Sequence, residues 1–210
     1  MGGTDKIWAR LGSGPVVAES LERLAPLADE TIVVVRNDSL HRARCQLAAV
    51  CPGLRVVEGG AERSDSVLNG LLAVHDAQIV AIHDAARPFV TARILLDGVS
   101  LLDRWEGAIP VVPIADTLKR IDEDGGIVET VDRSTIRSAQ TPQVFRLESL
   151  LGAYEKLGGN RGDATDDAAV LERVGVPVAT FPGSPLNYKI TTPLDLTVAR
   201  LLSASGAAAR

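Results

Sequence analysis

The chain has few cysteines and no long apolar run. It contains two cysteines in 210 residues, Cys45 and Cys51, and their spacing matches no zinc-binding signature. We therefore expect two reduced thiols and no disulfide framework. No apolar run approaches the length of about 18 residues that crosses a bilayer, so no membrane span is predicted. The amino terminus also lacks the apolar core of a signal peptide, which favours a cytoplasmic location.

Positive charge is in deficit as well. The 22 lysines and arginines are outnumbered by 27 aspartates and glutamates, which gives a net charge of -5. This balance argues against a surface that wraps nucleic acid. A local basic cluster could still bind a free nucleotide or a sugar phosphate. Hydrophobic residues make up 46% of the chain, enough to bury a sizeable core in a single domain spanning residues 1–210.

Residues 79–88 are the stretch around which the predicted fold is organised. An apolar run without alternation, 79–83, predicts a strand buried on both faces. It is followed at once by an acid, two alanines, a base and a proline. Ligands of open α/β sheets bind beyond the carboxyl ends of the strands, so Asp84 and Arg87 stand where chemistry is usually done. Taken locally, Asp84 could equally be a helix cap and Arg87 a surface charge.

Strand and helix patterns alternate along the first half of the chain. Apolar or β-branched strands are predicted at 31–35, 54–58, 79–83 and 108–114, with amphipathic helices between them. This alternation predicts parallel βαβ units with right-handed crossovers. We therefore expect a Rossmann-like, doubly wound α/β domain with a mostly parallel sheet. The first 14 residues resemble a polar loop.

The alternation stops after residue 114. Two short strand patterns, 116–121 and 127–131, flank the polar stretch 122–126, which predicts a β-hairpin. We expect this protruding arm, within 115–140, to lie over the site or to reach a neighbouring subunit. Helices near 146–157 and 165–173, a last strand at 176–181 and a closing helix from Pro193 are predicted to follow.

Charged and hydroxyl side chains gather in the predicted loops. The cationic candidates are Lys6, Arg63, Arg87, Arg133 and Lys189, and the hydroxyl and acidic candidates are Ser66, Asp84, Thr117, Thr141 and Thr165. Each alone has an ordinary alternative as a solvated, capping or turn residue. His83 is expected to be a core or supporting residue rather than a base. The residues themselves therefore predict only an α/β enzyme that acts on a phosphate-bearing ligand.

Six short motifs, taken together, resemble those of one family. They are His83-Asp84-Ala85-Ala86-Arg87-Pro88, Arg63-Ser64-Asp65-Ser66-Val67, Asp116-Thr117-Leu118-Lys119, Ala139-Gln140-Thr141-Pro142-Gln143, Thr165-Asp166-Asp167-Ala168 and Asn187-Tyr188-Lys189-Ile190-Thr191. Their order over nearly the whole chain is similar to that of the 2-C-methyl-D-erythritol 4-phosphate cytidylyltransferases, whose fold is of the nucleotide-diphospho-sugar transferase type. The resemblance implies an enzyme of non-mevalonate isoprenoid biosynthesis. Such an enzyme transfers CMP from CTP to methylerythritol phosphate, giving 4-diphosphocytidyl-2-C-methyl-D-erythritol and pyrophosphate.

The resemblance also implies a nucleotide site. The positions that match the cytosine and ribose pocket are Gly60, Ala61, Ser66 and Ala85. Asp84 matches an acid near the substrate and a magnesium ion, so Mg²⁺, or another divalent cation, is the implied cofactor. Lys6 matches a catalytic lysine that stabilises charge at the α-phosphate.

Positions around methylerythritol phosphate are implied in the same way. Arg87, Thr117 and Thr165 match residues that surround this substrate, and Lys189 matches a catalytic lysine that orients its phosphate. Arg133 and Thr141 match residues that the arm carries into the site of a partner subunit, so a homodimer is implied. Attack of one phosphate on another brings two anions together, and positioning and positive charge are expected to dominate the catalysis.

The amino terminus departs from the family pattern. The family begins with a strand and a loop of the form Ala-Ala-Gly-x-Gly-x-Arg-Met, and Met1 stands where that last methionine is expected. The family's Pro-Lys-Gln is replaced by Asp5-Lys6-Ile7. A strand missing here would lie between 31–35 and 79–83 and would leave unpaired backbone in mid-sheet. A start codon upstream and a truncated, inactive chain are both open, and we expect the chain as written to fold poorly and transfer little CMP.

Two other functions remain open at the level of sequence. A pentitol phosphate such as ribitol 5-phosphate is the nearest rival substrate within the same chemistry. A non-catalytic module for nucleotide binding or dimerisation is the alternative of a different class. Pyrophosphate release with each sugar phosphate in turn, and binding of CTP without product, would separate these alternatives.

Overall fold

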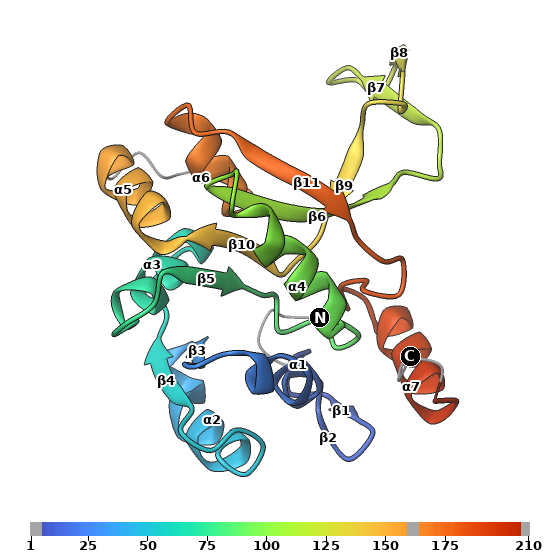
Figure 1. The fold of residues 1–210 in the computed structure, drawn as a ribbon. Coiled ribbons are helices and arrows are strands. Elements are labelled where there is room, and N and C mark those ends of the chain that lie inside the picture. The colour runs from blue at the N-terminus through green and yellow to red at the C-terminus, as the bar shows by residue number, and fades with distance from the viewer. Residues whose placement is uncertain (1–5, 159–163, 207–210) are drawn as a thin grey trace.

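The main sheet, with four strands side by side and a fifth, β9 (Arg137–Ala139), paired to one of them, lies at the centre of the upper half of the molecule (Figure 1). The computed structural model describes residues 6–158 and 164–206. The strands lie in the order β11 (Val178–Pro182), β6 (Gly107–Pro113), β10 (Gln143–Arg146) and β5 (Ile79–Ile82). β11 is parallel to β6, whereas β10 is antiparallel to both β6 and β5. Strands β5, β6 and β11 therefore run in one direction, with β10 inserted against them.

Helices cover both faces of this sheet. On one face α4 (Ala92–Leu101) packs through Ile94 and Leu95 against residues that include Val144 and Phe181. On the other face lie α3 (Arg63–Leu72), α5 (Leu147–Leu157) and α6 (Ala168–Arg173), around Phe145. Val144 and Phe145 serve opposite faces because successive side chains of a strand alternate. The predicted doubly wound α/β architecture is confirmed.

The sheet is split into two parts. β3 (Ile32–Val35) and β4 (Arg55–Glu58) form a separate parallel pair, which packs with α1 (Val16–Leu24) and α2 (Leu40–Leu47). Among the described residues, no strand joins β3 to β5. This is the position at which the sequence predicted a break. The prediction that β5 is buried on both faces is wrong, because its residues alternate between exposed and partly buried, and Ile79 is 37% exposed. Among the described residues, β5 has β10 as its one strand partner.

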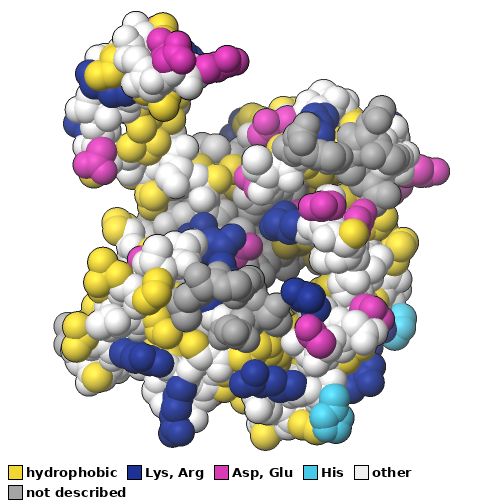
Figure 2. Space-filling view, turned by 180° about the vertical axis from the view of Figure 1, so that it is seen from behind, with side chains coloured by type: hydrophobic (Ala, Val, Ile, Leu, Met, Phe, Trp, Pro, Cys, Tyr) yellow, Lys and Arg dark blue, Asp and Glu magenta, His cyan; other side chains and the backbone are white. Residues whose placement is uncertain are grey.

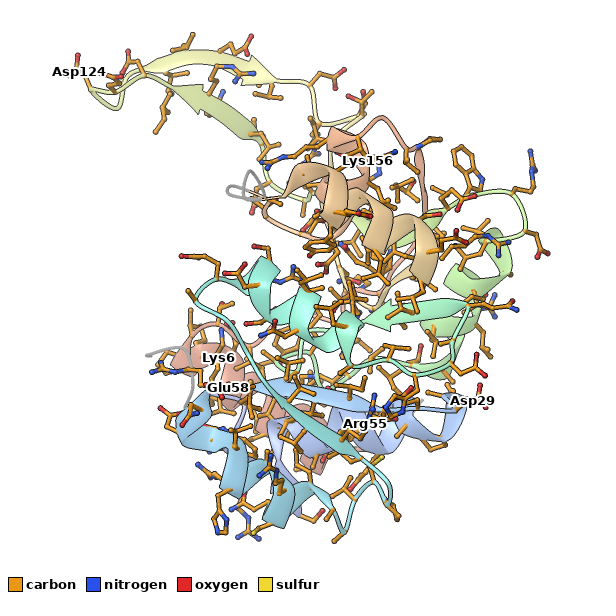
Figure 3. The ribbon with its side chains drawn as sticks, turned by 90° about the vertical axis from the view of Figure 1, so that its left-hand side faces the viewer. Lys6, Asp29, Arg55, Glu58, Asp124 and Lys156 are labelled. Atoms are coloured by element: carbon orange, nitrogen blue, oxygen red, sulfur yellow. The ribbon has the colours of Figure 1, made fainter. Side chains whose placement is uncertain are left out.

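The predicted arm is a hairpin of β7 (Leu118–Ile121) and β8 (Ile127–Val131). Its tip is closed by Asp122, whose Oδ1 accepts hydrogen bonds from the amides of Asp124 and Gly126. The arm projects from the body, and Asp124 lies at its outer end (Figures 1 and 3). After the hairpin the chain returns to the main sheet, where β9 (Arg137–Ala139) pairs with β6.

The short strands β1, β2, β9 and β10 were not predicted from the sequence. β1 (Arg10–Leu11) and β2 (Gly14–Pro15) pair where a loop was expected. β10 was missed because its four residues run directly into α5, with Arg146 as the N-cap. The chain closes with α7 (Pro193–Ala204), and two single turns of 3₁₀ helix lie at Ala25–Leu27 and Asn37–Ser39. Within the described residues, no helix has the length and apolar character needed to cross a membrane.

Candidate active site

A cavity of about 230 Å³ opens beyond the carboxyl end of β5. It is lined by Arg63, Asp84, Arg87, Ala139, Gln140, Thr141, Gln143, Thr165, Asp166 and Lys189. Because β10 is antiparallel to β5, residues at the start of β10 face the end of β5, and Gln143 is the register partner of Ile82. Figure 2 shows Lys and Arg side chains beside acidic ones in the middle of this side of the molecule. The antiparallel strand β10 thus contributes side chains to the cavity from its first residues, whereas β5 contributes through the residues that follow its end.

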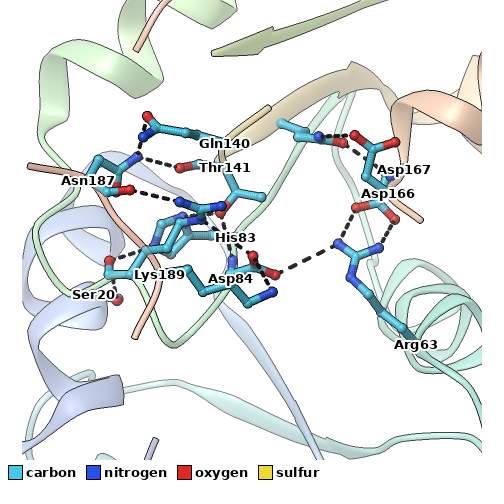
Figure 4. Close-up of polar contacts among 12 residues, drawn as sticks. Ser20, Arg63, His83, Asp84, Gln140, Thr141, Asp166, Asp167, Asn187 and Lys189 are labelled. Atoms are coloured by element: carbon cyan, nitrogen blue, oxygen red, sulfur yellow. Dashed lines mark hydrogen bonds and ion pairs between the residues drawn. The ribbon is translucent and has the colours of Figure 1, made fainter. Parts of the chain in front are cut away.

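Asp84 is surrounded by cations from separate segments of the chain (Figure 4). The Nζ of Lys189 lies 2.9 Å from Asp84 Oδ2, and the Nε of Arg87 lies 3.4 Å from the same oxygen. Arg63 Nη2 lies 4.0 Å from Asp84 Oδ1. Burial raises the pKa of Asp84, but these positive charges outweigh it and hold the pKa below its ordinary value. Asp84 is therefore an ionised carboxylate with three cationic side chains within 4.0 Å of its oxygens.

Arg87 ties the turn after β5 to the loop that carries Lys189. Its backbone amide closes the turn by donating to Asp84 O at 2.9 Å. Its guanidinium Nη1 donates to the backbone carbonyl of Asn187 at 2.8 Å. Asn187 is fully buried, and its side-chain Nδ2 donates to Thr141 O. Burial lowers the pKa of Arg87, and the charge of Asp84 opposes that shift. The two charged residues of the turn are thus held by contacts on both sides.

Arg63, which lines the cavity, pairs with Asp167 behind it. Arg63 donates two hydrogen bonds, at 3.0 and 2.7 Å, to the two oxygens of Asp167, whose side chain is completely buried. Burial raises the pKa of Asp167 despite this contact. Burial also opposes the charge of Arg63, but the bonds to Asp167 prevail and raise the pKa of Arg63. The pair fixes the first residue of α3 to the segment before α6.

Thr141 lies in this chain's own cavity. Its Oγ1 accepts from the Asp84 amide at 2.9 Å and lies 3.1 Å from Nδ1 of His83, and only 4% of the residue is exposed. The prediction that the arm carries Thr141 into a partner's site is therefore wrong. The hairpin ends at Val131, and β9 has already returned the chain to the main sheet before Thr141. Thr165 lines the same cavity, as expected.

Of the predicted nucleotide residues, Gly60 and Ala61 lie on the turn before α3, Ser66 lies in the first turns of α3, and Ala85 follows β5. The amide of Gly60 donates to Ser66 Oγ at 3.1 Å, and Ser66 Oγ donates to Glu62 O. A Cβ at Gly60 would lie 2.3 Å from Cβ of Asp65, so only glycine fits there. Ala61 is exposed on the turn, whereas Ala85 packs against the core beneath β3 and β4. The turn leads directly into Arg63 and so adjoins the cavity.

Three further predicted residues, like the four nucleotide positions, do not line the cavity. Thr117 is exposed in the segment before β7, and Arg133 follows β8, where its Nη1 donates to the carbonyl of Ala115. Lys6 is partly buried and lies near the start of the described chain. The single chain therefore does not bring Thr117, Arg133 or Lys6 to the cluster around Asp84.

Two glutamines at the cavity were missed from the sequence. Gln143 is 1% exposed; its Nε2 donates to Asp166 Oδ2 at 2.8 Å, and its Oε1 accepts from the amides of Asp167 and Ala168. Gln140 is 4% exposed and exchanges two hydrogen bonds with the backbone of Ser184. Both belong to the motif 139–143. Their positions on either side of a threonine–proline pair were the available signal, since buried glutamines are uncommon.

Comparison with known proteins shows which proteins this chain resembles. Residues 1–204 match the sequence model of the family described as 2-C-methyl-D-erythritol 4-phosphate cytidylyltransferase. The chain is 40% identical over 204 residues to the protein of that name from Symbiobacterium thermophilum, covering 96% of this chain and 86% of the relative. It is 40% identical to the protein of that name from Saccharopolyspora erythraea, covering 93% of this chain and 94% of the relative.

Solved structures show the same similarity. The crystal structure of 2-C-methyl-D-erythritol 4-phosphate cytidylyltransferase from Thermus thermophilus superposes with a TM-score of 0.81 at 30% identity, covering 95% of this chain and 93% of the other. The structure of 4-diphosphocytidyl-2C-methyl-D-erythritol synthase from Anaerococcus prevotii gives a TM-score of 0.85 at 28% identity, covering 93% and 91%. The similarity therefore extends over almost the entire fold.

Proposed function

The chain belongs to the 2-C-methyl-D-erythritol 4-phosphate cytidylyltransferase family, and from this premise we propose how its own residues carry out the reaction. The protein is a nucleotidyltransferase of isoprenoid biosynthesis that transfers CMP from CTP to 2-C-methyl-D-erythritol 4-phosphate. The observation that supports the placement of the reaction is the cavity in which Lys189, Arg87 and Arg63 converge on Asp84. Such a cluster of cations suits a ligand with a phosphate group.

The cavity is proposed to hold methylerythritol phosphate. Its volume of about 230 Å³ is below the range of about 300–1,000 Å³ usual for drug-sized ligands, which suits a small phosphorylated polyol. Lys189, 38% exposed at its side chain, can reach a phosphate that enters, and the more deeply buried Arg87 can complete the contact. Thr165, Asp166 and the two glutamines supply polar groups for the substrate hydroxyls.

The reaction forms one P–O bond and breaks another. An oxygen of the methylerythritol phosphate attacks the α-phosphorus of CTP, and the bond to pyrophosphate breaks. Both reactants are anions, so cations that lie between them lower the repulsion in the transition state. We assign this role to Lys189 and, by its resemblance to the family's lysine, to Lys6. The nucleotide is proposed to lie along the turn with Gly60, Ala61 and Ser66, next to Ala85.

A magnesium ion is proposed to bind together with CTP. Among the described residues, no group of three or more His, Cys, Asp and Glu side chains gathers to hold a metal. Magnesium usually keeps several waters and binds to one or two carboxylates plus the phosphates of the substrate, so Asp84 alone is a sufficient protein ligand. Its Oδ1 accepts no hydrogen bond from the described residues, and Arg63 Nη2 lies 4.0 Å from it. When bound, the ion neutralises the triphosphate and stabilises pyrophosphate as it leaves.

A homodimer is proposed to complete the site. The arm exposes Ile121, Ile127 and Val128 to solvent at 60–67%, an apolar surface that a second copy could cover. Arg133 at its base is outside the cavity of its own chain, and the proposal places it, with Thr117, near the partner's substrate. Mixing Lys189→Ala with Arg133→Ala subunits should restore activity to about a quarter of the sites, since half of the dimers are mixed and each has one intact site. No restoration in mixed dimers would show that Arg133 acts within its own chain.

A cytoplasmic location is proposed for the protein. The reaction consumes CTP, and both cysteines are free, Cys45 exposed and Cys51 buried. Free thiols suit a reducing compartment. Fractionation of cells that produce the protein tests the proposal.

The deciding experiment is a pyrophosphate-release assay with CTP and methylerythritol phosphate. Parallel reactions with ribitol 5-phosphate test the substrate, and parallel reactions with UTP or GTP test the nucleotide. Release with CTP and methylerythritol phosphate alone is the expected result. Faster release with ribitol 5-phosphate would reassign the substrate, and CTP binding without any product would indicate a non-catalytic module.

A further inference from the structure

His83 lies behind the turn that carries Asp84 and Arg87 and contacts both of its ends (Figure 4). The turn itself is closed by the hydrogen bond from the Arg87 amide to Asp84 O. At one end, Nε2 of the partly buried imidazole lies 3.1 Å from Arg87 O. At the other end, Nδ1 lies 3.1 Å from Thr141 Oγ1, which accepts from the Asp84 amide at 2.9 Å.

The partners of the ring define where its proton lies. Arg87 O is a carbonyl and can only accept, so Nε2 of His83 carries a hydrogen and donates it. The Asp84 amide can only donate, so Thr141 Oγ1 uses one lone pair to accept from it. The hydroxyl hydrogen of Thr141 then needs an acceptor, and the unprotonated Nδ1 of His83 is in position to be one. The Nε2–H tautomer therefore gives every group a partner. The Asp84 amide donates to Thr141 Oγ1, the Thr141 hydroxyl donates to His83 Nδ1, and His83 Nε2 donates to Arg87 O.

The carbonyl of Arg87 has a second support. Ser20 of α1, which is 5% exposed, donates from Oγ to the same oxygen at 3.2 Å. The imidazole and this hydroxyl together use both lone pairs of the carbonyl. The turn is therefore anchored on the side away from the cavity, while the side chains of Asp84 and Arg87 line the cavity itself.

We propose that His83 is a positioning residue for the transfer reaction: as the Nε2–H tautomer it holds both ends of the 84–87 turn and so directs Asp84 and Arg87 into the cavity. A consequence concerns Thr141. Its hydroxyl hydrogen is committed to His83, so it is not free to donate to a substrate phosphate. Thr141 therefore contributes to the site through the Asp84 amide. The proposal rests on the assignment of Asp84 and Arg87 to the reaction site.

The first test needs no variant in the site. The chain has three histidines, so ¹⁵N-histidine labelling and two-bond ¹H–¹⁵N correlation spectra of the whole protein can report each tautomer at neutral pH. The resonances of His41 and His75 are assigned by His41→Asn and His75→Asn. We expect His83 to show the Nε2–H pattern with slow exchange of that proton. A Nδ1–H pattern, or a doubly protonated ring at neutral pH, overturns the proposal.

The second test separates positioning from folding. His83→Gln keeps a donor near Arg87 O but offers no acceptor at the Nδ1 position, whereas His83→Asn can place its Oδ1 there. We expect His83→Gln to lower kcat about ten-fold or more and to raise the KM for methylerythritol phosphate, with the KM for CTP little changed. His83→Asn should lose less than His83→Gln. His41→Asn, at an exposed position of α2, is the matched control and should leave both constants unchanged.

A double variant tests the shared path. If His83 acts on Asp84 through Thr141, His83→Gln combined with Thr141→Val should lose no more kcat than Thr141→Val alone. Losses that multiply, or a fall in active-site concentration without any change in KM, would overturn the positioning role. Absence of pyrophosphate release by the unmodified protein would instead count against the proposed function. The tautomer measurement remains decisive for His83 in either case.

Discussion

Lys189 and Asp84 are far apart in the sequence, yet the Nζ of Lys189 lies 2.9 Å from Asp84 Oδ2. Arg87 contacts the same oxygen, so one carboxylate compensates cations that would otherwise repel one another. Without ligand, the cluster is thus held together by its own acid. An entering phosphate is expected to compete with Asp84 for Lys189 and Arg87, which leaves the carboxylate available for a metal ion.

Lys189→Ala should reduce turnover strongly and stability little. Removal of one well-placed group that stabilises developing charge typically costs about 10²–10³-fold in kcat. The side chain is 38% exposed, and Asp84 keeps Arg87 as a partner, so the melting temperature should change slightly. Lys156→Ala on α5, an exposed lysine, is the control (Figure 3). Unchanged steady-state pyrophosphate release would remove Lys189 from the mechanism.

Lys6→Ala tests a residue that the structure does not bring to the cavity. The resemblance to the family nevertheless implies a role at the α-phosphate, so we expect kcat to fall far more than the free energy of unfolding. Steady-state kinetics and urea denaturation of the same preparation measure both. A full rate in Lys6→Ala would show that the match of Asp5-Lys6-Ile7 to the family pattern does not carry the function.

Arg63→Leu should destabilise the fold. It leaves the completely buried carboxylate of Asp167 without its cation, and breaking one partner of a buried pair costs about 3–5 kcal/mol. Arg93→Leu is a matched control, because Arg93 pairs with Asp97 at the surface with 86% of its side chain exposed. That change should cost less than about 1 kcal/mol. Equal unfolding free energies for the two variants would contradict the structural role of Arg63.

Asp195 in the first turn of α7 predicts an acid dependence of stability. Hydrogen bonds from Thr191 and Thr192 lower the pKa of Asp195 from 3.8 to about 2. The folded form thus holds the carboxylate more strongly ionised than the unfolded chain does. Its stabilisation is complete above about pH 4 and is lost as the pH falls toward about 2. The difference in unfolding free energy between the protein and Asp195→Asn should therefore shrink as the pH falls from about 4 to about 2, and a constant difference would contradict the assignment.

Ile127→Asp tests the arm as a dimer contact. Ile127 is 67% exposed in the single chain, and a charge there should prevent its burial against a second copy. We expect sedimentation velocity to show monomers and pyrophosphate release to fall with dimer content. Leu96→Asp on α4, where the leucine is 55% exposed, is the control. A dimer that persists in Ile127→Asp would place the interface elsewhere.

Several elements were predictable because their signals are local. The apolar periodicity of α1 and the polar tip between β7 and β8 depend on residues close together in the chain, and both elements were found as expected. β10 was not predictable in this way. Its four residues carry no period of their own, and their place between β5 and β6 depends on partners elsewhere in the chain.

The residues of the site likewise divide into those that a local sequence signal could predict and those that it could not. Charge type and motif order sufficed to select Asp84, Arg87, Thr165 and Lys189, because each stands in a loop beyond a strand or before a helix. The sequence by itself therefore determined the fold class, the family and most of the charged groups. Only the tertiary structure decided that Thr141 lies in its own chain's cavity, that Gln143 joins it, and that His83 supports the turn. Those three depend on contacts made across the sheet, and hydrogen bonds between distant segments leave no periodic pattern in the residues that form them.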